Sequence, residues 1–448
     1  MTEFDPRALS VLERLKAAGY QAVFVGGCVR DSLRALPPHD YDAATSARPE
    51  EILRVCGDLH CIETGIQHGT ITVLSQGLPV EVTTFRREGT YSDHRHPDQV
   101  SFTPYLEEDL ARRDFTINAM AWDGCTLIDP FGGLEDLRRR QIRCVGNPDQ
   151  RMEEDALRLL RGLRLAAQLE FHLCPSTAQA IRSHTPQLSL VAWERICHEW
   201  LRLLCGPGAE PILLEFPQVT VQVIPELQPA VGFDQHSPYH YYDVYTHSVK
   251  TLAGVSPSPA LRLAALLHDL GKPATFSLDE QGTGHFYAHP QIGATLAGTT
   301  LERLRVDRTT REHVIALIAR HHLPVEPTRP WVGRWLSRLG KSLFFDLLAI
   351  KRADAMACAP RLNGGLDFLA QVEQLAQDIL AQPHCLSRSD LAINGQDALT
   401  AGLSGPEVGH ALTILLDEVA QGKLENSRPV LLQQLRQLKK EKSPHLFP

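Results

Sequence analysis

The chain has 448 residues, more than a single hydrophobic core usually supports, so we expect roughly two to four structural units. Hydrophobic residues make up 43% and charged residues 22%, as in ordinary globular proteins, and the net charge of −8 excludes a uniformly basic nucleic-acid-binding protein. No apolar run is long enough to span a bilayer, the acidic start MTEFDPRALS is no signal peptide, and ten cysteines without a CxxC pair suit a reducing environment, so we expect a cytoplasmic protein without membrane attachment.

The N-terminal region, residues 1–145, is predicted to be an α+β unit, because helical and strand patterns alternate along it. Leucines recur at helical spacing in its first segment, which ends at a glycine. We expect helices at 5–18 and from Cys28, and strands at 20–25, 41–45, 69–75 and 79–86.

After Pro148 the pattern becomes helical, and no run beyond about residue 220 resembles a strand. A strongly apolar helix is expected at 260–271. Proline-rich stretches divide the helical part. We therefore predict a helical neck and body at 146–235, a histidine-rich domain at 236–357 and a helical C-terminal region at 358–448.

Two glycines, Gly26 and Gly27, stand between a predicted strand and a predicted helix. Glycine lets a backbone approach a ligand closely, and the amides at a helix start attract phosphate. Arg30, one turn into that helix, is placed to bind a triphosphate oxygen. A tight turn without a ligand explains the glycines alone equally well.

Asp40 and Asp42 stand at the start of the next strand, where residues two apart point to the same side. Neighbouring carboxylates repel one another unless a cation lies between them, and magnesium takes one or two carboxylates together with substrate phosphates. Magnesium ions at this site would activate a 3′-hydroxyl and neutralise pyrophosphate. The alternatives are turn-promoting aspartates and, for Glu81 as a third carboxylate, an exposed strand residue.

These residues belong to a longer ordered pattern over residues 20–205. It resembles the class II tRNA nucleotidyltransferase and bacterial poly(A) polymerase family of the DNA polymerase beta nucleotidyltransferase superfamily. The resemblance implies an α+β nucleotidyltransferase head followed by an all-α neck and body. It also implies magnesium at Asp40 and Asp42, and nucleotide contacts from Gly27, Arg30 and Arg113. The motifs are GGCVRDSLRALPPHDYDAATSARPEEI, VEVTTFRREGTYSDHRHPDQVSF, EEDLARRDFTINAMAW, LIDPFGGLEDL, EEDALRLLRGLRLAAQL and ERICHEWLRLL.

Residues 153–167 read as an amphipathic helix with leucines on one face and Asp155, Arg158, Arg161 and Arg164 around the other. Cytosine and adenine each present an amino donor beside a ring-nitrogen acceptor, so an aspartate can accept from the amino group and an arginine can donate to the ring nitrogen. Uracil and guanine present a carbonyl beside a ring N–H, which the same two side chains would not bind. The resemblance assigns this choice to Asp155 and Arg158, with Arg161 and Arg164 near the nucleotide. A solvated polar face is the alternative.

The polar segment 87–98 is predicted to be a mobile loop. By the resemblance, family members that add only CC lack such a loop, and those that add the terminal A have it. The loop therefore favours A-adding or complete CCA-adding activity.

The region 236–357 carries an ordered histidine–aspartate series: His247, His268, Asp269 and Asp354, with His289 and His321-His322 between. Imidazole and carboxylate donors suit a divalent transition metal. The series resembles the HD phosphohydrolase superfamily, whose ligands match the first four residues. The resemblance implies an unidentified divalent metal and hydrolysis of phosphomonoesters or 2′,3′-cyclic phosphates. A purely structural domain is the alternative.

The segment 391–426 resembles the helical tail of the same nucleotidyltransferases, so the C-terminal region is expected to hold tRNA by its backbone and shape. The sequence thus predicts magnesium-dependent addition of CCA to tRNA from CTP and ATP, without a nucleic-acid template. The alternatives are A addition alone, a poly(A) polymerase, an HD phosphohydrolase with an RNA-docking front half, and a non-catalytic RNA-binding protein. The oligomeric state stays open.

Overall fold

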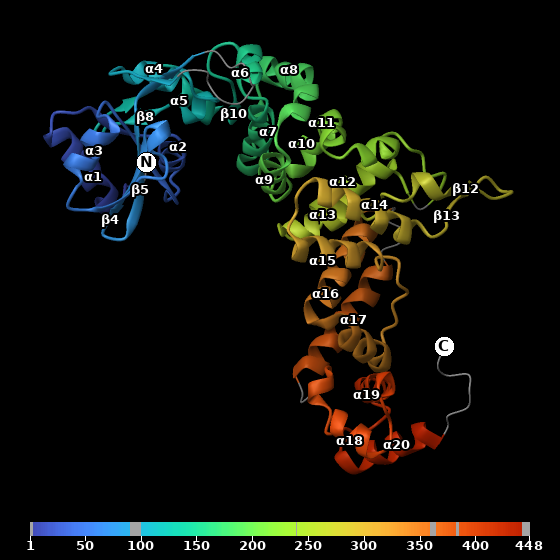
Figure 1. Ribbon diagram of the computed structural model, residues 1–448. Helices are drawn as coiled ribbons and strands as arrows, with labels where there is room; N and C mark the ends of the chain where they lie inside the picture. The colour runs from blue at the N-terminus through green and yellow to red at the C-terminus, as the bar shows by residue number, and fades with distance from the viewer. Residues whose placement is uncertain (1–2, 90–99, 239, 359–363, 382–384, 441–448) are drawn as a thin grey trace. The chain divides into compact units, whose positions relative to one another are not determined.

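The computed structural model describes residues 3–89, 100–238, 240–358, 364–381 and 385–440. The chain forms two compact units, Met1–Pro225 and Glu226–Pro448, which are described separately below (Figure 1). Within the described ranges, no helix is long and apolar enough to cross a membrane.

The first unit begins with a seven-stranded sheet in the order β3-β4-β5-β2-β1-β8-β9. β2 and β5 pair in parallel, and the other neighbouring strands pair antiparallel. Side chains alternate between half-buried and fully buried along β4, so one face of the sheet carries more of the core than the other. The strands are β1 (Ala22–Val25), β2 (Tyr41–Thr45), β3 (His60–Ile62), β4 (Thr70–Ser75), β5 (Leu78–Thr84), β8 (Ala121–Trp122) and β9 (Leu127–Ile128).

Three helices pack on this sheet, a short hairpin and a fourth helix lie between β5 and β8 in the chain, and a fifth helix follows β9 (Figure 1). These elements agree with the α+β head that the sequence predicts. The helices are α1 (Pro6–Ala17), α2 (Gly27–Leu33), α3 (Pro49–Val55), α4 (Leu106–Ala111) and α5 (Gly133–Arg138), and the hairpin pairs β6 (Arg86–Glu88) with β7 (Val100–Phe102).

The rest of the first unit is helical, with one two-residue strand pair of β10 (Gln141–Ile142) and β11 (His172–Leu173). The single helix predicted over 153–167 is wrong, because the backbone of Asp155 is extended, at φ −146° and ψ 106°. The Asp155 carboxylate accepts the Leu157 amide at 3.0 Å and thereby satisfies a free donor at the start of the second helix. The helices are α6 (Pro148–Glu154), α7 (Leu157–Leu169), α8 (Pro175–His184), α9 (Trp193–Leu204), α10 (Ala209–Glu215) and α11 (Pro217–Val223).

Among its described residues, the second unit is helical except for one hairpin, which corrects the expectation of no strand after residue 220. Strands β12 (Phe276–Leu278) and β13 (Gly284–Phe286) are three residues each, too short for an alternating pattern to show in the sequence. The helices are α12 (Val244–Ala253), α13 (Pro259–Leu267), α14 (His289–Arg303), α15 (Arg308–Ile318), α16 (Arg329–Ala357), α17 (Gly364–Ala381), α18 (Gly395–Thr400), α19 (Pro406–Ala420) and α20 (Arg428–Lys440).

Candidate active site and metal cluster

The turn between β1 and α2 forms an open cradle at the edge of the sheet. Gly26 has a φ of +73°, a conformation that glycine adopts without strain. A methyl group built on Gly26 would lie 3.4 Å from both Arg113 Nη1 and Asp42 Oδ2. The glycine therefore brings the backbone close to an arginine and a carboxylate that are distant in sequence.

The parallel register of β2 and β5 places Asp42 directly opposite Glu81. Asp40 stands one residue before β2 and is exposed. Burial, then the nearby Glu81, raises the pKa of Asp42 to about 6, and Asp40 adds to this against the opposing effect of Arg113. Three carboxylates thus gather where one arginine offsets part of their charge, an arrangement that suits a hard divalent cation with oxygen ligands.

Two arginines beside this cluster are held by their own acidic partners. Arg113 donates to Asp109, whose side chain is buried, at 3.2 Å. Arg30 forms a bidentate ion pair with Asp31 and donates a hydrogen bond to Asn118 Oδ1 at 2.8 Å. Both guanidinium groups are therefore fixed in direction, as a phosphate-binding group must be.

The predicted base-selecting pair does not form in this structure. Asp155 pairs with Arg195 of α9 at 2.8 Å. Arg158 instead pairs with Glu154 and donates to the carbonyls of Arg151 and Arg112, both at 3.2 Å. Asp155, the expected acceptor for an amino group, and Arg158, the expected donor to a ring nitrogen, are therefore each bound to a different residue of the protein.

The other two predicted arginines of α7 are also paired. Arg161 binds the buried Asp114 at 2.7 Å, and Arg164 binds Glu199 of α9 at 2.7 Å. Arg158 and Arg164 are each only 8% exposed. The alternative of a solvated polar face is therefore wrong for Arg158 and Arg164. The spacing of charged and apolar residues along the helix gave no reason to expect that these arginines are buried.

Sequence reasoning missed the partners that hold these groups. Each of the missed residues stands inside one of the quoted motifs, and that position was the available signal. In particular, Arg195 and Glu199 lie one helical turn apart in ERICHEW and so face the same side of α9. The missed partners are Asp109, Asp114, Glu154, Arg195 and Glu199.

The second unit brings the four predicted HD residues together. α12 carries His247, the end of α13 carries His268 and Asp269, and α16 carries Asp354. His247 Nε2 lies 3.0 Å from Asp354 Oδ1 and 3.5 Å from Asp269 Oδ2. His268 Nε2 lies 3.1 Å from Asp269 Oδ2. The ligand atoms of His247, His268 and Asp354 are close enough to one another to share one ion, and Asp269 adjoins both histidines.

Three imidazole nitrogens of this cluster are buried without a hydrogen bond of good geometry: His247 Nδ1 and Nε2, and His268 Nε2. His268 Nδ1 is 2.8 Å from the Ala265 carbonyl, so that nitrogen carries the proton and Nε2 offers its lone pair. Lys272 Nζ, 2.7 Å from Asp269 Oδ2, is the cation nearest to that carboxylate in the cluster. Buried imidazole nitrogens beside two carboxylates fit a divalent metal ion.

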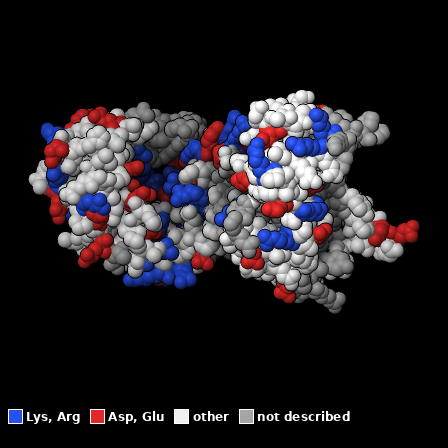
Figure 2. All heavy atoms as spheres, turned by 90° about the horizontal axis from the view of Figure 1, so that it is seen from below, with Lys and Arg blue, Asp and Glu red and all other residues white. Residues whose placement is uncertain are grey.

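The predicted loop and the charged side chains are the two surface features that bear on the site. Of the predicted loop 87–98, residues 90–98 lie outside the described part of the chain, and β6 and β7 flank it. Lysine and arginine side chains lie in small groups among acidic ones on the face of each unit that Figure 2 shows. Arg138 and Arg139, at the C-terminal end of α5, are exposed beside Glu135.

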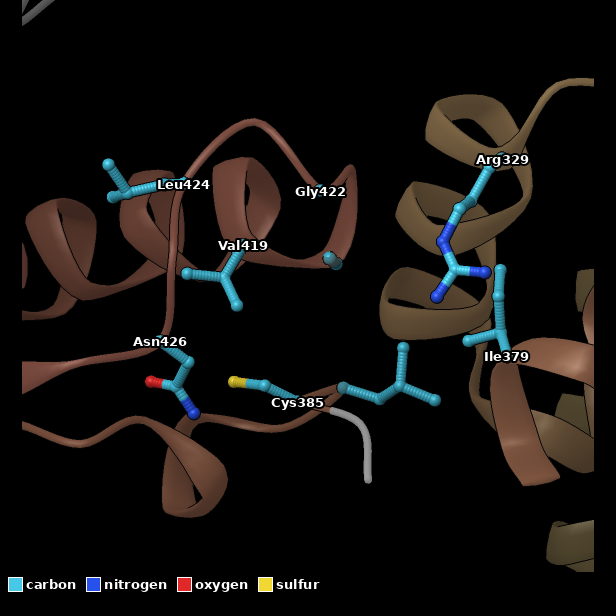
Figure 3. A pocket seen from close by; sticks show the side chains of 9 residues that line it. Arg329, Ile379, Cys385, Val419, Gly422, Leu424 and Asn426 are labelled. Carbon is cyan, nitrogen blue, oxygen red and sulfur yellow. The ribbon is translucent and has the colours of Figure 1, made fainter. Parts of the chain in front are cut away.

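A pocket of about 400 Å³ in the second unit lies beside α16, α17 and α19 (Figure 3), and none of its lining residues belongs to the HD cluster. Val419, Cys385 and Asn426 face the same space there. The amide of Asn426 is already bonded to the backbone of Asp390 and Ala392, at 2.8 and 2.9 Å. This polar group therefore holds two loops together, and we assign the pocket no chemistry.

Three protein-family models match the chain. Residues 22–143 match the poly A polymerase head domain, and residues 170–230 match a probable RNA and SrmB-binding site of polymerase A. Residues 244–357 match the HD domain. The head model covers the sheet with its carboxylates, and the HD model covers all four predicted histidine and aspartate ligands.

The chain is similar over its whole length to characterised relatives. The CCA-adding enzyme of Levilactobacillus brevis is 35% identical over 443 residues, which are 96% of this chain and 97% of the relative. The CCA-adding enzyme of Geobacillus stearothermophilus is 33% identical over 448 residues, 94% of each chain. The match to the CCA-adding enzyme of Ligilactobacillus salivarius is 49% identical but spans about half of both, 47% of this chain and 52% of the relative.

Two solved structures show the same architecture. The Bacillus stearothermophilus CCA-adding enzyme in complex with CTP has a TM-score of 0.75 and 29% identity, with 98% of each chain covered. The Thermotoga maritima CCA-adding enzyme complexed with tRNA has a TM-score of 0.59 at 18% identity, covering 97% of this chain and 96% of that one, a likeness of fold alone.

Proposed function

The chain belongs to the family of CCA-adding enzymes, and on that premise we propose that it adds CCA to the 3′ end of tRNA from CTP and ATP without a nucleic-acid template. The observation that carries the proposal is the convergence of Gly26, Asp42 and Arg113, with Glu81 opposite Asp42. A phosphate-accepting turn and a carboxylate cluster in one place are what nucleotidyl transfer needs.

In the head, Asp40 and Asp42 would hold magnesium, with Glu81 as a third carboxylate. When bound there, magnesium supplies a Lewis acid that activates the attacking 3′-hydroxyl and neutralises the leaving pyrophosphate. The Gly26–Gly27 turn lets the triphosphate approach the backbone, and Arg30 and Arg113 bind its oxygens. Because Asp31, Asn118 and Asp109 fix these guanidinium groups, little ordering is left for the bound nucleotide to supply.

In the neck, Asp155 would accept the amino group of cytosine or adenine, and Arg158 would donate to the ring nitrogen. Arg161 and Arg164 would support the nucleotide from the same helix. Arg158 contacts the carbonyl of Arg112, the residue before Arg113, so the segment that binds the triphosphate also touches the helix that reads the base. Base choice and phosphate binding are thereby coupled within the first unit.

A second candidate function belongs to the HD cluster. The buried imidazole nitrogens of His247 and His268, next to the Asp269 carboxylate, favour a bound divalent metal, and with it hydrolysis of a phosphoester. We also propose four functional regions: a catalytic head at 1–145, a neck and body at 146–235, an HD domain at 236–357 and a tRNA-binding tail at 358–448. The ten free cysteines support a cytoplasmic location.

The test is nucleotide incorporation on three tRNA transcripts, ending before CCA, after C and after CC, with labelled CTP, ATP or both. Addition of CCA to the shortest transcript followed by a stop supports the proposal. A single A added only to the CC-ended transcript would make the chain an A-adding enzyme, and open-ended A addition would make it a poly(A) polymerase.

The assignment of the head site has its own test. Asp42→Ala should abolish incorporation while tRNA binding stays nearly unchanged. Turnover that survives in this variant would exclude the proposed magnesium site, and the HD cluster would then become the principal candidate.

A further inference from the structure

A second pocket, of about 470 Å³, adjoins the HD cluster in the second unit. Cys358 lines it, and the Cys358 Sγ atom lies 3.9 Å from Asp354 Oδ1 and 3.6 Å from His240 Nδ1. The ring centroids of His240 and His247 are 5.2 Å apart. The pocket is therefore one side chain away from the proposed ligands of the HD metal. Its volume lies within the range of about 300–1,000 Å³ that is usual for small-molecule sites.

Two small residues line this pocket where α12 and α16 meet. Gly254 caps the end of α12, and Ala353 lies on α16, next to Asp354. A methyl group built on Gly254 would lie 2.9 Å from the Ala353 Cβ atom, so the backbones of the two helices approach closely here. Because neither residue has a long side chain, this wall leaves room for a flat ligand.

The larger side chains that line the pocket are aromatic, sulfur-containing or cationic. Lys250 Nζ lies 5.7 Å from the centroid of the Tyr242 ring, within the range of a cation–π contact. Tyr241 is 68% exposed and Met356 is 62% exposed, so the ring and the thioether are accessible to a ligand. Exposed aromatic faces stack on nucleobases, and thioethers pack well against flat rings. The lysine gives the pocket the positive charge that favours an anionic ligand.

We propose that this pocket binds the base of a nucleoside phosphate whose phosphoester lies at the HD cluster. Tyr241 stacks on the base, Met356 packs against it, and Lys250 attracts the phosphate. The inference rests on the second candidate function proposed above, because it narrows the substrates of the HD cluster from phosphoesters to nucleotides. A free nucleotide and the terminal nucleotide of an RNA share this chemistry.

The experiment titrates the full-length protein with adenosine in the presence of a chelator, by calorimetry. Adenosine carries the base without a phosphate, so its binding to the pocket requires no metal ion. Tyr241→Ala removes the ring, and Tyr241→Phe keeps it. Tyr287→Ala is the matched control, because Tyr287 is 73% exposed and lies outside the pocket. Circular dichroism verifies that each variant folds.

An adenosine site that is lost or weakened about tenfold or more in Tyr241→Ala, and unchanged within about twofold in Tyr241→Phe and Tyr287→Ala, supports the proposal. Adenosine bound in the head would be unaffected by Tyr241→Ala, so the comparison locates the site. Equal binding in the parent and in Tyr241→Ala overturns the proposal. No binding in the parent, or the same loss in Tyr287→Ala, also overturns it.

The same titration with a trinucleotide of adenosine distinguishes the two sources of the nucleotide. Binding that depends on Tyr241 and is tighter than that of adenosine assigns the pocket to an RNA end, and binding that is no tighter assigns it to a free nucleotide. Either result supports the pocket.

The HD function is tested separately, by phosphate release from the 2′-, 3′- and 5′-monophosphates of adenosine after Co²⁺ is added. No release beside intact, Tyr241-dependent adenosine binding overturns the phosphohydrolase and leaves a nucleoside-binding pocket. Release without Tyr241-dependent binding overturns the pocket alone.

Discussion

Arg195 of α9 binds Asp155 at the break between α6 and α7, with its Nη2 atom 2.8 Å from Oδ2. The pair is partly buried, with 28% of the arginine side chain and 16% of the aspartate side chain exposed. One turn later on the same helix, Glu199 binds Arg164. α9 therefore holds both ends of the segment proposed to read the base, although no residue of α9 is proposed to touch it.

Replacing Arg195 with methionine should loosen base choice. The methionine keeps the apolar stem but removes the charge that orients Asp155, so the carboxylate loses a bond of roughly 1.5–3 kcal/mol. Discrimination against UTP should fall about tenfold or more, because 1.4 kcal/mol corresponds to a factor of ten. The measurement is kcat/KM for CTP and UTP on a tRNA lacking CCA. Arg202→Met, an exposed position on α9, is the control and should leave the ratio unchanged.

The strands and helices that position the head site were predictable because their patterns are long and regular. The strands expected at 41–45, 69–75 and 79–86 formed at 41–45, 70–75 and 78–84. The hairpin β12–β13 was missed because three-residue strands carry no period. The break at Asp155 was missed because the apolar spacing of the leucines continues through it, whereas the aspartate's cap to Leu157 is a local competitor that periodicity does not see.

The residues of the candidate site could be predicted from the sequence, but the ion pairs that they form could not. Asp42 and Gly26 could be named from their motif, and their proximity to Arg113 follows only from the folded chain. The sequence suggested that Asp155 would act beside Arg158, but their spacing of three residues does not reveal the competing partners Arg195 and Glu154. Ion pairs between distant segments depend on how the helices pack, and sequence patterns within one segment do not predict that packing.

Gly26→Ala should impair catalysis more than folding. The added methyl group would be strained at φ +73° and would lie 3.4 Å from Asp42 Oδ2 and Arg113 Nη1. We expect kcat to fall at least tenfold while the thermal midpoint drops by a few degrees, for about 1 kcal/mol of strain. Gly19→Ala is the matched control, since its φ is +91° but nothing lies within 4 Å of the added carbon. Equal losses of kcat in the two variants would contradict the proposed cradle.

Asp42→Asn should stabilise the metal-free protein at neutral pH. Burial and the neighbouring carboxylates raise the folded-state pKa of Asp42 from 3.8 to about 6. The folded state therefore binds the Asp42 proton more tightly than the unfolded state does. The contribution of this group to the free energy of unfolding is greatest below pH 4 and is lost as the pH rises through 6. In a chelator, the variant should gain about 1–3 kcal/mol at pH 7.5 and nothing at pH 4. Denaturant unfolding at both pH values measures this, and an equal effect at both would contradict the pKa argument.

Glu81→Gln should raise the magnesium concentration needed for half-maximal addition. Glu81 stands opposite Asp42 in the β2–β5 register, so its charge adds to the attraction for a cation even without direct ligation. We expect a several-fold shift that excess magnesium overcomes, whereas Asp42→Asn should not be rescued. Glu63→Gln, an exposed position after β3, serves as the control. Glu81 is an exposed residue of β5, and an unchanged magnesium requirement would leave it no part in the site.

Glu199→Ala should destabilise the first unit because it leaves Arg164 buried without its partner. Only 10% of the arginine side chain and 8% of the glutamate side chain are exposed, and burial lowers the pKa of Arg164 to about 10 despite Glu199. Breaking such a pair from one side costs about 3–5 kcal/mol, and replacing both partners by apolar groups costs much less. Denaturant unfolding of Glu199→Ala and of Glu199→Leu with Arg164→Met should show this difference. Glu215→Ala breaks the exposed pair with Arg182 and should cost under about 1 kcal/mol. If the double variant were less stable than Glu199→Ala, the loss would come from packing of the side chains rather than from an unpaired charge.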